Sequence, residues 1–186
     1  MSGRRAALLA GGSVMLVIIV LLAINLTWVV GNWDTLRPVG RGGQAPALDL
    51  PRAEGGRARL ADHRGQVVLV SFWASWCGPC LREMPLLAQL QHRHGKQGFI
   101  VLAINVEGNP DTVRQVRAAH PAARDLTMLL DVDGEAARSY GVQTLPHLVL
   151  VDREGRVIHV HVGGGGAEEL EQAVQQALHS GEPTRS

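Results

Sequence analysis

The sequence predicts an α/β domain with a mixed central sheet, preceded by one transmembrane helix. Two observations support this prediction. Short apolar runs alternate with amphipathic stretches over most of the chain, and strands that alternate with helices are typical of an α/β sheet. Near the start, the residues from Ala6 to Val30 carry no charge, which is typical of a membrane segment. The chain therefore divides into an anchor and one folded domain.

The length and composition are those of one ordinary domain with an appendage. The chain has 186 residues, of which 46% are hydrophobic and 19% are charged, so it can bury a core and is not expected to be disordered. Its formal net charge is only +1, and no basic block is longer than Arg4–Arg5. Because such a surface has no broad positive charge, nucleic-acid binding is not expected.

The uncharged run at residues 6–30 is long enough to cross a bilayer. At about 1.5 Å per residue, a helix over this run reaches about 37 Å, whereas the hydrocarbon core is about 30 Å thick. A cleaved signal peptide is the alternative, but its apolar region would span about 7–15 residues and end at a small-residue cleavage site. We expect an uncleaved anchor with residues 1–5 in the cytoplasm, because a short tail before a large domain suits that orientation.

The apolar pattern after the anchor predicts a tether and then a domain. Residues 31–43 lack periodicity and contain four glycines and a proline, so we expect a tether there, a domain at residues 44–180 and a flexible tail at residues 181–186. The predicted strands are Val67–Ser71, Phe99–Asn105, Thr127–Asp131, His147–Asp152 and Arg156–Val162. The predicted helices are Pro79–Gly95, Asp111–His120, Gly134–Gly141 and Ala167–His179, the first ending at a glycine suited to a helix C-terminus.

The only two cysteines, Cys77 and Cys80, stand three residues apart where the strand from Val67 leads into a helix. The unsatisfied N–H groups and the dipole of a helix N-terminus favour a thiolate, so we expect Cys77 to be the nucleophile. Cys80 lies one helical turn later and is expected to be less exposed, which suits a resolving thiol. The pair is therefore a candidate for catalytic thiol-disulfide exchange.

Two other roles are open to the cysteine pair. A structural disulfide over so short a loop would constrain little of the unfolded chain and would stabilise the fold little. A metal site could recruit His92, His94 or His147, but structural zinc needs four ligands, and no second ligand pair at close spacing is present. A metal-binding or metallochaperone module therefore remains the alternative to a redox enzyme. If the chain is a redox enzyme, we expect it to need no metal and no other cofactor.

Three segments resemble a known family, namely FWASWCGPC, the following REMP, and YGVQTLPHLVLVDREGRV. They are similar to membrane-anchored thiol-disulfide oxidoreductases of the TlpA/ResA type. The resemblance implies a thioredoxin-like fold with a central insertion, and APALDLPRAEGGRARLADHRG resembles the N-terminal extension of that family. It also implies a protein-disulfide reductase on the outer side of the bacterial inner membrane. Its expected partners are disulfide-bearing proteins such as apocytochrome c, and a transmembrane electron donor of the CcdA/DsbD kind.

The resemblance assigns roles to the residues around a proline that faces the cysteines. Pro146 matches a proline that is cis in the family, and a cis peptide there would leave the backbone of Leu145 free to pair with an extended substrate. His147 stands where thioredoxin usually has a threonine. It either brings a titratable group to the site or belongs to a strand and points to solvent, and the second interpretation is favoured.

Other assignments concern the residues around the cysteines. Glu83 matches an acid that tunes the thiols in the family, although it could equally face solvent on its helix. The dipeptide Gly78–Pro79 is that of thioredoxin and favours reduction. Trp76 is expected in the docking surface and Trp73 in the core.

Three further positions narrow the function. Ser71 stands where thioredoxin has a buried aspartate, so a proton relay through that aspartate is absent. Ala74 stands where a peroxidase of the peroxiredoxin type would need Thr or Ser, so peroxidase activity is not expected. The run Gly163–Gly166 lacks the lysine and hydroxyl residue of a phosphate-binding loop and is expected to be a flexible loop.

Overall fold

The computed structural model describes residues 3–31 and 40–180, which belong to two compact units. The first unit contains α1, a helix of 29 residues from Gly3 to Gly31. Within the part of the chain that the structure describes, no helix is both long and apolar enough to cross a membrane. Most of the predicted tether and the whole of the predicted tail at residues 181–186 lie outside the described residues.

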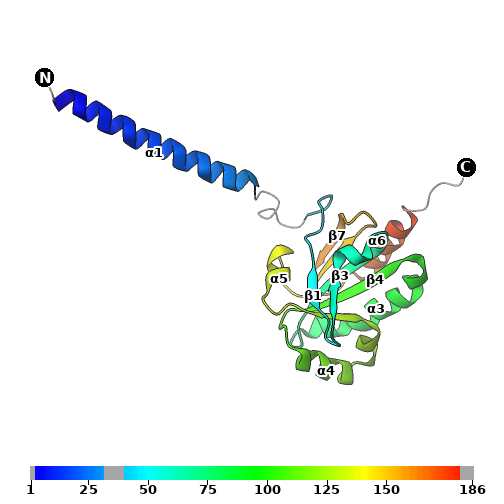
Figure 1. The fold of residues 1–186 in the computed structure, drawn as a ribbon. Coiled ribbons are helices and arrows are strands. Elements are labelled where there is room, and N and C mark those ends of the chain that lie inside the picture. Colours follow the sequence, from blue (N-terminus) through cyan, green and yellow to red (C-terminus); the bar gives the residue numbers. More distant parts are fainter. Residues whose placement is uncertain (1–2, 32–39, 181–186) are drawn as a thin grey trace, which may run out of the picture. The chain divides into compact units, whose positions relative to one another are not determined.

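The second unit is built on a mixed sheet of five strands in the order β5-β4-β3-β6-β7 (Figure 1). β3 and β4 are parallel, as are β4 and β5, whereas β6 runs antiparallel to β3, and β7 antiparallel to β6. The strand bounds are Val67–Trp73 for β3, Phe99–Asn105 for β4, Thr127–Leu130 for β5, His147–Val151 for β6 and Val157–Val162 for β7. The predicted mixed α/β sheet is confirmed.

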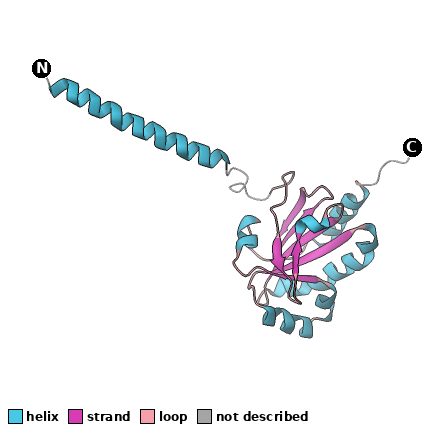
Figure 2. Cartoon of the chain, viewed as in Figure 1, coloured by secondary structure: helices cyan, strands magenta, loops and turns pink. Residues whose placement is uncertain are grey.

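Helices lie on both sides of the sheet (Figure 2). They are α3 at Gly78–His94, α4 at Pro110–Ala119, α5 at Glu135–Ser139 and α6 at Ala167–His179.

The end of α3 differs from the expected helix end at a left-handed Gly95. Gly95 has a φ of −56°, the chain continues in the short 3-10 helix η2 (Gly95–Gln97), and the left-handed residue is Gly98, with a φ of 85°. The turn comes three residues later because η2 tightens the end of the helix.

The sheet separates two apolar cores, and successive residues of β3 point into different ones. Trp73 belongs to the core that also contains both cysteines and the apolar faces of α3 and α6. We call this side of the sheet the cysteine face. Phe72 belongs to the opposite core, where its ring packs against that of Tyr140 at the end of α5. This alternation decides which side chains can reach the cysteines.

The segment before β3 covers the face opposite the cysteines. At one edge of the sheet, Gln44 forms a bridge with Arg156, just before β7. The segment then forms a hairpin of β1 (Asp49–Pro51) and β2 (Arg57–Arg59), and Arg52 between them bridges Leu129 of β5 at the other edge. The segment thus crosses the opposite face from edge to edge, whereas α3 and α6 cover the cysteine face.

Candidate active site

The first cysteine caps the helix that carries the second. Cys77 is the N-cap residue of α3, and its sulfur accepts a hydrogen bond from the backbone N–H of Cys80 at 3.2 Å. Its own N–H donates to the carbonyl of Ala74 at 3.1 Å, which closes the turn after β3. Pro79 stands in the first turn of α3, where its fixed φ is preorganised for a helix. Free helix N–H groups beside the sulfur stabilise a thiolate on Cys77.

The structure shows the oxidised form, in which Cys77 and Cys80 are joined by a disulfide. The two residues are 4% and 3% exposed, so exposure does not distinguish them as expected. Both lie in the core that includes Trp73, because α3 packs its first turn against the sheet. The assignment of Cys77 as nucleophile therefore depends on its place at the helix N-terminus.

The two tryptophans beside the pair lie in different environments. Trp76 is 72% exposed, whereas Trp73 is 1% exposed. A large apolar side chain exposed beside a reactive sulfur offers a contact area to another protein. Trp73 lies in the core, as predicted.

The peptide bond between Leu145 and Pro146 is cis, as the resemblance implied. The carbonyl of Pro146 accepts a hydrogen bond from Gly163 N–H at 2.9 Å, so this turn is tied to the end of β7. Among the described residues, the backbone N–H and C=O of Leu145 have no hydrogen-bond partner. Leu145 therefore presents free backbone groups before β6.

His147 is buried, so the expectation that it points to solvent is wrong. It is 6% exposed, and its sheet partner is Phe72. Directly paired residues share a face of the sheet, and the His147 ring meets the Phe72 ring edge-on with centroids 6.1 Å apart. His147 thus lies on the face opposite the cysteines. Burial lowers the pKa of His147, which keeps its ring neutral near pH 7.

Glu83 lies against the glycine run and does not extend freely into solvent. Its Oε1 accepts a hydrogen bond from Gly165 N–H at 3.2 Å. Burial raises the pKa of Glu83, although this hydrogen bond and the charges of His161 and Arg82 act in the opposite direction. The carboxyl group therefore stays protonated to higher pH than usual.

The glycine run Gly163–Gly166 is packed against the start of α3, contrary to the expectation of a free flexible loop. A Cβ built on Gly164 would lie 3.1 Å from Cβ of Pro79, which is closer than most real contacts. Only a residue without a side chain allows the loop this near to the dipeptide between the cysteines. A Cβ built on Gly78 would lie 3.3 Å from the Arg82 guanidinium, so this side chain also lies beside the dipeptide.

Comparisons with known proteins agree with this geometry. The model of the AhpC/TSA family matches residues 41–160. The chain belongs to this family. The AhpC/TSA chain is 31% identical over 161 residues to the thiol-disulfide oxidoreductase ResA of Geobacillus thermodenitrificans. This match covers 87% of this chain and 91% of the relative. It is 29% identical over 149 residues to ResA of Bacillus subtilis, covering 80% of this chain and 82% of the relative.

A comparison with a solved structure identifies the fold. The chain is 37% identical, with a TM-score of 0.71, to a putative thiol:disulfide interchange protein DsbE from Chlorobium tepidum, covering 75% of this chain and 99% of that one. The AhpC/TSA domain thus has a thioredoxin-like fold, and its activity is that of a thiol-disulfide oxidoreductase with the pair Cys77 and Cys80.

Glu107 is a further residue at this site, which the sequence analysis missed. Its carboxylate accepts hydrogen bonds from the backbone N–H of Ser75 at 2.6 Å and from the Ser75 hydroxyl at 2.9 Å, and a third from Asn105 at 3.2 Å. Partial burial acts to raise the pKa of Glu107, but the hydrogen bonds from Ser75 and Asn105 act more strongly in the opposite direction. The pKa of Glu107 is therefore below its usual value. Glu107 therefore holds the turn that carries Trp76. Its position just after β4 was the available signal, since parallel strands β3 and β4 end side by side.

The histidines do not assemble a metal site with the cysteines. In residues 15–30 and 40–180, no group of three or more His, Cys, Asp or Glu side chains could hold a metal ion. His92 is exposed and lies 3.5 Å from a carboxylate oxygen of Asp125. His94 packs edge-on against Phe99. The described residues therefore do not fit the metal alternative.

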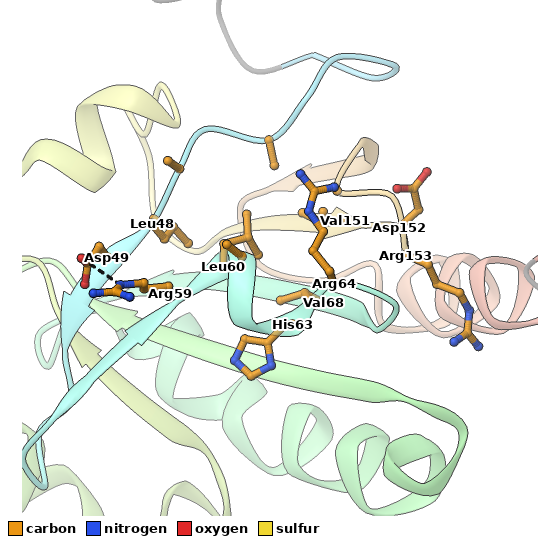
Figure 3. A pocket seen from close by; sticks show the side chains of 14 residues that line it. Leu48, Asp49, Arg59, Leu60, His63, Arg64, Val68, Val151, Asp152 and Arg153 are labelled. Atoms are coloured by element: carbon orange, nitrogen blue, oxygen red, sulfur yellow. Dashed lines mark hydrogen bonds and ion pairs between the residues drawn. The ribbon is translucent and has the colours of Figure 1, made fainter.

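A cavity of about 290 Å³ lies at the other end of β3 (Figure 3). Leu48, Leu60, Val68 and Val151 form its apolar part, and an ion pair of Arg59 with Asp49 borders it. Val68 stands near the start of β3, whereas the cysteines follow its end, so the cavity is roughly 20 Å from the sulfurs. None of the predicted site residues lines it.

Proposed function

We propose that the protein is a membrane-tethered protein-disulfide reductase that acts outside the cytoplasm through Cys77 and Cys80. The observation that carries this proposal is the position of the Cys77 sulfur at the N-terminus of α3, within a disulfide to Cys80. There the thiolate form of Cys77 is favoured, and Cys80 lies within bonding distance for the second step. The Gly78–Pro79 dipeptide supports the reducing direction by its resemblance to thioredoxin.

The proposed reaction moves two electrons and two protons. The Cys77 thiolate attacks one sulfur of a substrate disulfide, so that a mixed disulfide forms and one substrate thiolate leaves. The Cys80 thiolate then attacks the Cys77 sulfur, which breaks the mixed disulfide and releases the second substrate thiolate. The pair ends as a disulfide, and the two protons that its thiols lost are taken up by the two substrate thiolates.

Two features support a protein as the substrate. The exposed Trp76 supplies an apolar contact beside Cys77. The free backbone groups of Leu145, next to the cis Pro146, are able to pair with an extended segment of a substrate chain. A disulfide in an extended or unfolded chain, such as that of apocytochrome c, fits this arrangement.

The location is proposed from the N-terminal sequence. The run from Ala6 to Val30 carries no charge in the sequence, and residues 1–5 precede it. This supports a single-pass anchor in the bacterial inner membrane with the domain on the periplasmic or extracytoplasmic side. A reductase in an oxidising compartment must receive electrons from elsewhere, and a transmembrane donor of the CcdA/DsbD kind would supply them.

The redox state and location of the full-length protein in cells test this proposal. We expect the protein to sediment with membranes, to be digested by protease added outside the inner membrane, and to hold Cys77 and Cys80 mostly as thiols after acid quenching and alkylation. Oxidised cysteines at steady state would indicate an oxidase. A soluble protein shortened past Val30 would show a cleaved signal peptide and would contradict the tether.

A further inference from the structure

Two titratable side chains contact the glycine run Gly163–Gly166. Gly165 donates its N–H to Glu83. The ring of His161 packs against the next residue, Gly166, so closely that a Cβ built there would lie 3.0 Å from Nδ1. Two successive glycines thus contact a carboxyl group of α3 and an imidazole of β7.

His161 lies on the same face of the sheet as the cysteines. Its sheet partner is Leu148, which belongs to the core that contains Cys77 and Cys80. Glu83 follows Cys80 by three residues on α3, so the two share a side of that helix. The fold thus places the His161 imidazole, the Glu83 carboxyl group and the Cys80 thiol on one side of the sheet.

Glu83 and His161 each have a buried polar atom without a hydrogen-bond partner among the described residues. Oε2 of Glu83 and Nε2 of His161 are buried and have no hydrogen bond to the described residues. A buried polar atom without a partner is costly and is seldom found without a reason. Here the two atoms belong to neighbouring groups that can each gain or lose a proton.

We propose that His161 is a positioning residue of the active site, which by its charge sets the protonation of Glu83 and through Glu83 the reactivity of the thiols. This inference rests on the proposed role of Glu83 near the cysteines. A protonated His161 ring lowers the pKa of Glu83 and so favours the carboxylate. The carboxylate in turn disfavours a thiolate nearby.

Other charged groups around His161 must be separated from this effect. Arg82 on α3 also lowers the pKa of Glu83. On β7, His159 lies two residues away on the same face, where its ring contacts Arg41 at 3.1 Å and Glu169 of α6 at 4.0 Å. Burial lowers the pKa of His159, and the charge of His161 also lowers it, so the His159 ring stays neutral to lower pH than usual. His159 is the matched control because its described interactions are with Arg41, Glu169 and His161 and not with Glu83.

The sign of the change distinguishes an effect through Glu83 from a direct one. If His161 acted directly on the thiols, removing its positive charge would disfavour the thiolate and slow alkylation. If it acts through Glu83, its removal leaves Glu83 protonated to higher pH, and alkylation becomes faster. Because histidine as a residue type changes charge between about pH 5 and 8, the effect should appear in that range.

The test is the pH dependence of iodoacetamide alkylation in the reduced full-length protein. We expect His161→Gln to speed alkylation roughly two- to fivefold over the mildly acidic range, and His159→Gln to leave it unchanged. In a Glu83→Gln background, His161→Gln should give no acceleration. Slower alkylation, no change, or equal acceleration in both backgrounds would overturn the inference.

Two further readouts keep the outcomes distinct. If Glu83→Gln alone leaves the alkylation profile unchanged while disulfide reduction continues, the role of Glu83 and this inference both fail, but the reductase stands. An NMR titration of the wild-type protein needs no variant to fold. We expect the Glu83 carboxyl signal to titrate in two steps, and a single-step curve would contradict the coupling.

Discussion

Replacing Cys80 with alanine is expected to trap substrate proteins on Cys77 as mixed disulfides and to reduce turnover to the uncatalysed rate. The Cys77 thiolate remains at the helix N-terminus and still attacks, but the thiol that releases the substrate is absent. The mixed disulfides are measured after acid quenching by non-reducing electrophoresis, and their attachment site by mass spectrometry. They should disappear when a reductant is added.

The matched variant is Cys77→Ala, which should trap no partner although it retains one cysteine. This comparison is informative because both cysteines are similarly buried in the disulfide form, so burial alone would predict similar behaviour. Equal trapping by the two variants would show that the roles of nucleophile and resolving thiol are assigned wrongly.

Gly108→Ala is expected to destabilise the domain by about 2–4 kcal/mol, because a side chain there has no space. Gly108 has a φ of 63°, and a Cβ would lie 2.6 Å from Cα of Val132 and 3.1 Å from the carbonyl oxygen of Asp131. Backbone atoms cannot move away as a flexible side chain can. Asp131 also accepts hydrogen bonds from the first N–H groups of α5, so a shift would extend to that helix. The free energy of unfolding in urea measures the loss.

Gly141→Ala separates the steric contact from backbone strain. Gly141 has a φ of 66°, close to that of Gly108, but a Cβ there would meet nothing within 4 Å. Strain alone should cost about 1–2 kcal/mol. If the two variants unfold at the same urea concentration, the contact between Gly108 and the Asp131–Val132 backbone has been overestimated.

Local patterns were sufficient to predict the elements that carry the cysteines. The apolar run at Val67 and the cysteine pair predict a strand that leads into a helix, because both features depend only on neighbouring residues. The bounds Phe99–Asn105 and Ala167–His179 are also as predicted. In contrast, the face on which His147 lies depends on its pairing with Phe72, which is distant in the sequence.

The contacts around the active site could not be predicted because they join distant segments. Glu107 meets Ser75 across 32 positions in the sequence, and Glu83 meets Gly165 across 82. The composition of the glycine run indicated freedom of the backbone. In the structure, the absence of a side chain on Gly164 allows a close approach to Pro79. That contact depends on how β7 and α3 lie together and so could not be predicted from the local sequence.

The most direct test of the central claim is to count disulfides in one turnover. The fully reduced full-length protein is mixed with an excess of a disulfide-bonded protein, quenched with acid, alkylated and weighed by mass spectrometry. The account predicts that one disulfide forms between Cys77 and Cys80 for each substrate disulfide that is reduced, and that neither Cys77→Ala nor Cys80→Ala completes the exchange. Substrate reduction that leaves Cys77 and Cys80 as thiols, or no exchange with any protein disulfide, would contradict it.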